Sequence, residues 1–181
     1  WAAYAELSSG YLRSGLDTSP ERIELARVQA ERAVKLAPRS FAARFAKANY
    51  LRGREGPALV EAEKLLRELA AENPDDGRVL ITLGKVIWGA LGQGLNLARA
   101  EEAIAVFARA EKIPAAQAEA AGQRGWLLFN LGRGIEAEAA IDDSLRSPTA
   151  PVLNSALKVI MSMMRGDLDA AKIALARIPR G

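Results

Sequence analysis

Five prolines divide this 181-residue chain at nearly even intervals. They are Pro38, Pro74, Pro114, Pro148 and Pro179, and the successive separations are 36, 40, 34 and 31 residues. Proline cannot continue an α-helix and is common just beyond a helix end. Helix ends that recur about every 35 residues are typical of helical-repeat proteins, in which each repeat is one helix–turn–helix unit.

The segment before each of these prolines has the same apolar spacing. Each set begins with an alanine, and its next two members follow at intervals of four and three residues. These intervals place each set on one face of a helix, and the leading alanine lets a second helix approach closely. The five sets are Ala26, Ala30 and Ala33; Ala62, Leu66 and Leu69; Ala103, Phe107 and Ala110; Ala137, Ile141 and Ser144; and Ala171, Leu175 and Ile178.

A second helix is expected ahead of each set. In the third repeat an apolar stripe falls within residues 78–91, and the first repeat has a stripe with the same intervals. These stripes are Leu80, Leu83, Gly84, Ile87 and Leu91, and Tyr4, Leu7, Ser8 and Tyr11. A small residue recurs at one slot, at Ser8, Ala48, Gly84 and Gly125, which predicts tight packing of the paired helix. Glycines mark the turns between paired helices, at Gly15, Gly56, Gly92, Gly94, Gly132, Gly134 and Gly166.

The sequence therefore predicts an all-α chain of five helix–turn–helix repeats. We expect a single domain over residues 1–181, with repeats at approximately 1–39, 40–75, 76–115, 116–149 and 150–181. Strands are not expected, because no sustained alternation of apolar and polar residues is present. An irregular all-α bundle is the alternative.

This pattern resembles the tetratricopeptide repeat (TPR) family, in particular TPR domains of the bacterial type. The motifs that carry the resemblance are Leu80-x-x-Leu83-Gly84-x-x-Ile87 followed by Ala103-x-x-x-Phe107-x-x-Ala110, and Gly125-x-x-Leu128 followed by Ala137-x-x-x-Ile141. It covers essentially the whole chain and implies a right-handed superhelix, an α-solenoid of about five repeats. Arg44 and Lys47 depart from it, because they stand near core slots of the second repeat.

The composition excludes several classes of chemistry. The chain has no cysteine and no histidine, so thiol nucleophiles, disulfides, thiolate or imidazole metal sites and histidine acid–base catalysis are excluded. Adjacent acidic pairs such as Asp142 and Asp143 point about 100° apart on a helix and make poor catalytic dyads. We expect no enzyme activity, no catalytic residue, no cofactor and no metal.

Nucleic-acid binding is also disfavoured by the residues. The net charge is only +3, whereas binding to phosphates depends on clustered Lys and Arg. Related helical repeats that read RNA place polar residues at one recurrent slot of the first helix. The comparable slots here are Ala5, Phe45, Ile81, Gly122 and Ala156, whose side chains cannot hydrogen-bond to base edges. An RNA-binding repeat therefore remains a distant alternative.

The candidate site is the concave face, which the first helices of stacked pairs line. Residues off the core stripes combine aromatics, amides and cations, a mixture that suits an extended or helical peptide. The candidates are Phe45, Asn49, Arg52, Arg78, Thr82, Lys85, Trp88, Gln123, Trp126, Phe129 and Asn130, with Glu6, Ser9, Glu119, Leu157, Ile160, Met163 and Met164 on the same predicted face. The alternative for the aromatics is packing between neighbouring first helices, and for the cations it is solvation or local pairing.

The leading hypothesis is a non-catalytic scaffold that binds a protein or peptide, with acidic partner segments favoured by the cations. A regulatory or sensory segment of a larger signalling protein or transcription regulator is the main alternative, and a self-association module is a further one. No uncharged apolar run reaches 18 residues, so no membrane span is expected. Because the chain begins with Trp1, we expect an excised domain or a processed product. Both a cytoplasmic and a periplasmic or envelope location fit a chain without cysteine.

Overall fold

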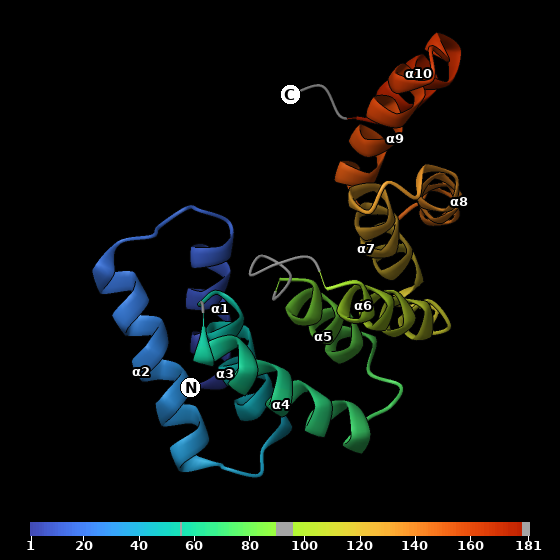
Figure 1. Ribbon diagram of the computed structural model, residues 1–181. Helices are drawn as coiled ribbons and strands as arrows, with labels where there is room; N and C mark the ends of the chain where they lie inside the picture. Colours follow the sequence, from blue (N-terminus) through green and yellow to red (C-terminus); the bar gives the residue numbers. More distant parts are fainter. Residues whose placement is uncertain (55, 90–95, 179–181) are drawn as a thin grey trace. The chain divides into compact units, whose positions relative to one another are not determined.

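The computed structural model describes residues 1–54, 56–89 and 96–178, which form ten α-helices and no strand (Figure 1). Successive helices pack as five pairs. The pairs are α1 (Ala2–Arg13) with α2 (Pro20–Leu36), α3 (Phe41–Arg52) with α4 (Pro57–Glu72), α5 (Gly77–Gly89) with α6 (Leu97–Ala110), α7 (Gln117–Asn130) with α8 (Gly134–Leu145), and α9 (Val152–Met164) with α10 (Leu168–Leu175). Each pair lies within one predicted repeat, so the all-α class and the five helix pairs are confirmed.

The helix ends follow the sequence signals. Ser19 precedes α2 and its side chain accepts a hydrogen bond from the backbone N–H of Arg22, while Pro20 takes the first helical position. Hydrogen bonds from Arg22 and Ser19 to the Asp17 carboxylate lower the pKa of Asp17 to about 2. Four predicted turns contain a glycine with positive φ, at Gly15, Gly56, Gly132 and Gly166. The predicted turn at Gly92 and Gly94 lies outside the described residues.

The chain divides into two compact units, residues 1–74 and 75–181. The first unit contains α1 to α4, and the second contains α5 to α10. The expectation of a single domain over 1–181 stays a prediction.

Small residues set the spacing within the helix pairs. Ala26, Ala62, Ala103 and Ala137 have no exposed surface. Across the α5–α6 pair, Gly84 faces the buried ring of Phe107 so closely that a Cβ on the glycine would lie 2.5 Å from Cε1 of that ring. Across the α7–α8 pair, a Cβ on Gly125 would lie 2.7 Å from Cδ1 of Ile141. The predicted small slot is confirmed in both pairs.

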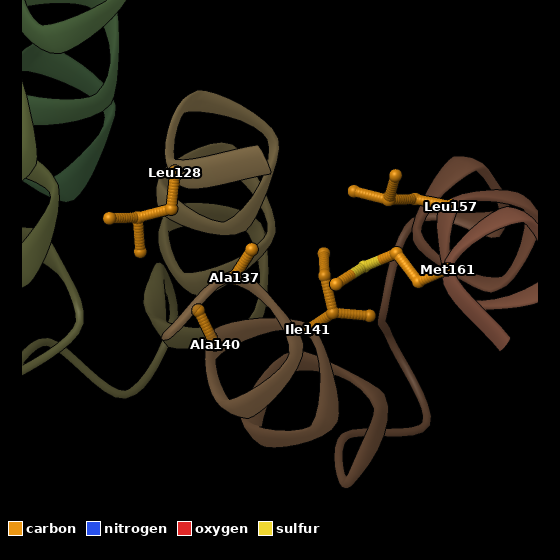
Figure 2. Close-up of a cluster of buried hydrophobic side chains, with 6 residues drawn as sticks. All are labelled: Leu128, Ala137, Ala140, Ile141, Leu157 and Met161. Atoms are coloured by element: carbon orange, nitrogen blue, oxygen red, sulfur yellow. The ribbon is translucent and has the colours of Figure 1, made fainter. Parts of the chain in front are cut away.

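Within each unit, the first helix of a pair also packs on the second helix of the pair before it. This contact joins α2 to α3, α6 to α7, and α8 to α9. Figure 2 shows the last of these contacts, where Ile141 of α8 meets Leu157 and Met161 of α9. One helix pair thus supplies half of a core that the next pair completes. Leu157, which was expected on the concave face, lies in this core instead.

Two predicted core stripes are wrong at the ends of the chain. Tyr4, Leu7 and Tyr11 of α1 are 63%, 60% and 39% exposed, and the buried residues of that helix are Ala5, Ser8 and Ser9. Leu175 of α10 is 56% exposed, and Ala174 is buried in its place. The physical reason is the same at both ends, because no described helix covers these positions.

The second repeat keeps its register despite its two charged core slots. Arg44 pairs with Glu72 and Lys47 pairs with Glu61, and both carboxylates belong to α4. The long side chains reach across the helix pair to these partners, while Ala48 and Leu51 remain buried.

We predict that Gly84→Ala destabilises the fold by about 1–3 kcal/mol relative to Gly89→Ala, because the new methyl group overpacks the Phe107 contact. Gly89 is the matched control, since it lies on the same helix and a Cβ there meets no atom of the described residues within 4 Å. Urea denaturation followed by circular dichroism measures the difference. Equal midpoints for the two variants would show that the α5–α6 contact is not close.

Candidate functional site

An ion pair links α5 and α7 on the predicted surface. Nζ of Lys85 lies 2.7 Å from Oε1 of Glu119, and the two residues belong to neighbouring first helices that also contact each other. Arg78, at the start of α5, pairs with Asp76 at 2.7 Å, and this hydrogen-bonded contact holds the pKa of the Asp76 carboxyl below its ordinary value. Both predicted cations are therefore locally paired, which leaves this part of the surface nearly neutral.

The three predicted aromatic site residues of the second unit are half-buried. Trp126 and Phe129 pack against the core cluster of α7, α8 and α9, and Trp88 is partly exposed near the end of α5. The Nε1 atom of Trp126 is buried, so the exposed part of its ring is carbon. Asn130 is exposed and donates its amide to the backbone oxygen of Trp126 at 2.7 Å, and Gln123 is half-buried.

Two predicted site residues are buried and make hydrogen bonds within the protein. Thr82 is 7% exposed and donates its hydroxyl to the backbone oxygen of Arg78 at 2.7 Å. Asn49 is 5% exposed and donates its amide to the Glu6 carboxylate at 3.0 Å, which joins α3 to α1. In the same unit, Phe45 stacks on Phe41 with ring centroids 5.8 Å apart, and Arg52 is half-buried.

A hollow of about 230 Å³ opens where the end of α7, the start of α8 and the end of α9 meet. Its lining residues are Phe129, Gly134, Ile135, Glu138, Met161, Met164 and Arg165. Ile135 is 90% exposed and Met164 is 73% exposed, although both are apolar. The volume is that of one large apolar side chain, and methionine adapts its shape to different partners.

Charged residues around this hollow are paired with one another. Glu138 pairs with Arg165 and with Lys158, and the Nζ of Lys158 lies 2.6 Å from the Glu138 carboxylate. Arg133, just before α8, hydrogen-bonds to Glu136, and this lowers the pKa of the Glu136 carboxyl. The hollow therefore has an apolar lining and a rim whose charges largely cancel.

A buried chain of hydrogen bonds positions the three helices around the hollow. The amide of Asn154 in α9 donates to Oγ of Ser144 in α8 at 2.9 Å, and that hydroxyl donates to the backbone oxygen of Ala118 in α7 at 2.6 Å. Gly122 makes room for it, since a Cβ there would lie 2.1 Å from Nδ2 of Asn154. Buried polar groups that satisfy each other fix one relative position of the helices.

Comparison with solved structures identifies the type of fold. No family model matches the sequence, and no curated protein matches it. Among solved structures, TTC0263, a thermophilic TPR protein of Thermus thermophilus, aligns with a TM-score of 0.76 and 20% identity over 98% of this chain and 90% of that protein. PilW, described as a widely conserved type IV pilus biogenesis factor, aligns with a TM-score of 0.70 and 20% identity over 98% of this chain and 76% of that protein.

The fold is of the tetratricopeptide-repeat type. YrrB, described as a TPR protein with an unusual peptide-binding site, aligns with a TM-score of 0.55 and 18% identity over 96% of this chain and 82% of that protein. At sequence identities of 20% or less, these similarities show a shared fold and not a shared function. The predicted fold class, an all-α solenoid of TPR-like repeats, is confirmed.

The sequence-based prediction did not include several residues that line the hollow in this TPR fold. Met164 was expected on the concave face, but Ile135, Met161, Glu138 and Arg165 were not singled out. The sequence carries one sign of the hollow, because Ile135 is an apolar residue that directly follows Gly134 and lies outside the Ala137 set. Periodicity alone does not show whether such a residue borders a neighbouring helix or open space.

A second hollow lies along α8, α9 and α10, and its two parts of about 220 and 420 Å³ share Leu145, Arg146 and Arg177. Arg177 donates to the backbone oxygen of Leu145 at 2.9 Å, and Arg146 pairs with Asp143 at 2.6 Å. Cations are favourable at the C-terminal end of a helix, where free carbonyl oxygens carry negative charge. Both arginines lie at the C-terminal end of α8, so this favourable interaction explains why they are found in this hollow.

Two further properties follow from the described part of the chain. None of its helices is long and apolar enough to cross a membrane. Nor does any group of three acidic side chains within residues 1–54, 56–89 and 96–178 gather as metal ligands would.

We predict that Ser144→Ala costs about 1–3 kcal/mol of folding stability, because the buried Asn154 amide loses its hydrogen-bond partner. Ser147→Ala is the control, since the Ser147 hydroxyl bonds only to the exposed Thr149 nearby. Chemical denaturation measures both changes. A Ser144→Ala variant as stable as the Ser147→Ala variant would contradict a positioning role for the buried chain.

Proposed function

We propose that the protein is a non-catalytic scaffold that binds a peptide segment of another protein on the surface formed by α5, α7 and the hollow beside α8 and α9. The observation that carries the proposal is the pair of exposed apolar residues, Ile135 and Met164, at an apolar hollow of about 230 Å³. TPR proteins among the solved structures include one described as having a peptide-binding site, which supports the same interpretation.

The chemistry of the surface favours an apolar anchor over an acidic one. Lys85 is paired with Glu119 and Arg78 with Asp76, so each cation lies beside a carboxylate that offsets its charge. The hollow instead offers carbon surface from Phe129, Ile135 and Met164 to a single large side chain. We infer a partner segment that inserts a leucine, methionine or phenylalanine there and lies against Trp126 and Trp88. A regulatory segment of a larger protein would receive its partner on the same surface.

A displayed library of random peptides tests the anchor. Peptides selected on the protein are expected to share a large apolar residue, and Ile135→Asp or Met164→Asp is expected to weaken their binding about 10-fold or more. The reason is that a carboxylate in the hollow removes the apolar contact and must itself be desolvated. Fluorescence polarisation of a selected peptide gives the affinities.

Val60→Asp is the matched control for this experiment. Val60 is also an exposed apolar residue, 72% exposed on α4 in the other unit, and its change is expected to leave binding unaltered. Peptides that bind the Ile135→Asp variant as tightly as the parent would place the site elsewhere.

A second test concerns the α5 part of the surface. Trp88→Ala combined with Lys85→Glu is expected to abolish binding of the selected peptides, because it removes an aromatic contact and places a second carboxylate beside that of Glu119. Circular dichroism checks that helicity is unchanged, and Leu97→Ala, at an exposed residue of α6, is the control. Full binding by the folded double variant would restrict the site to the hollow.

A further inference from the structure

All three methionines of the chain lie within four residues at the end of α9. Met161 is 5% exposed and packs in the core cluster of α7, α8 and α9 (Figure 2). Met163 and Met164 are 60% and 73% exposed. Met161 and Met164 both line the hollow of about 230 Å³, and Met163 is not among its lining residues. The chain therefore presents one exposed thioether at the hollow, a second outside its lining and a third that is buried.

The thioethers are the sulfur atoms that a peroxide can oxidise, because the chain has no cysteine. In this reaction a lone pair of the methionine sulfur attacks one oxygen of hydrogen peroxide, an S–O bond forms and the O–O bond breaks. The transferred oxygen loses its proton to the departing hydroxide, which becomes water. The sulfur is oxidised to a sulfoxide and the peroxide is reduced. Because the peroxide must reach the sulfur, we expect Met163 and Met164 to react before Met161.

A sulfoxide on Met164 changes the chemistry of the hollow. A thioether is apolar and flexible, whereas a sulfoxide carries a polar oxygen that accepts hydrogen bonds. An apolar side chain inserted against Phe129 and Ile135 takes that oxygen out of water and offers it no donor, which is unfavourable. Arg165 lines the same hollow, and its guanidinium can donate to the sulfoxide oxygen. Such a bond holds the polar group where the anchor of the partner would lie.

We propose that Met164 is a reversible oxidation site that controls the peptide surface, with the thioether admitting the apolar anchor and the sulfoxide excluding it. The oxidant is a peroxide. The restoring reaction is a reduction by a pair of thiols, which become a disulfide while the sulfoxide returns to a thioether and its oxygen leaves as water. This inference rests on the peptide site proposed above, and it deepens that proposal by naming a regulation of the same hollow.

The first experiment follows the oxidation of each methionine. The folded protein is treated with hydrogen peroxide, and peptide mass spectrometry measures how fast each methionine gains an oxygen atom. Met163 and Met164 are expected to react about 10-fold or more faster than Met161, which Ile141 and Leu157 cover. A saturating selected peptide is expected to slow the oxidation of Met164 and to leave that of Met163 unchanged.

The second experiment measures what oxidation does to binding. Peroxide is removed before a selected peptide is added, and fluorescence polarisation gives the dissociation constant before and after oxidation. For the parent this constant is expected to rise about 10-fold on oxidation and to recover after treatment with a methionine sulfoxide reductase and a dithiol. Met164→Leu, whatever its starting affinity, is expected to lose this sensitivity, and Met163→Leu is the matched control that keeps it. Met164→Gln, which places a polar oxygen in the hollow, is expected to weaken binding without peroxide.

Two results would overturn the regulation while the peptide site stands. One is an unchanged affinity of the parent once Met164 is fully oxidised, and the other is a Met164→Leu variant as sensitive to peroxide as the parent. In both cases weakened binding by Ile135→Asp keeps the peptide site at the hollow. Peptides that bind Ile135→Asp as tightly as the parent overturn the peptide site, and this inference fails with it.

Discussion

The close approach of paired helices through small residues is the contact on which the rest of the structure depends. Gly84 against Phe107, and Gly125 against Ile141, bring backbone and side chain together with no room for a Cβ. The alanines that lead each set are fully buried or nearly so for the same reason. Larger apolar residues of these helices also project toward the next pair, as Ile141 of α8 does toward α9. That projection makes each repeat dependent on its neighbour.

This dependence explains both the core and its open ends. Ile141 faces Leu157 and Met161 from the next pair, and Ile104 from the pair before packs against the same cluster. Where no neighbour is described, the matching position of α10 carries an exposed residue, Leu175. The same slot is therefore buried or exposed according to what lies beside it, and its residue type changes little.

Several polar groups of this protein are paired across helices, and this shapes the candidate surface. Lys85 with Glu119, and Glu6 with Asn49, each join two first helices. The chain from Asn154 through Ser144 to the Ala118 carbonyl does the same in the interior. Charges that satisfy one another leave little net field, so an apolar hollow becomes the most distinctive feature of the surface.

The sequence by itself determined the helices, their pairing and the small slots. Proline and glycine act on the backbone locally, and the Ala103 and Ala137 sets need only their own helix to define a face. It also identified Trp88, Trp126 and Phe129 as residues off the core stripes. Tertiary structure alone decided that Lys85 is neutralised by Glu119, that Thr82 and Asn49 are buried, and that Ile135 and Met164 border one hollow. Those outcomes depend on which residues of other helices lie opposite, and a periodicity within one helix carries no information about its neighbours.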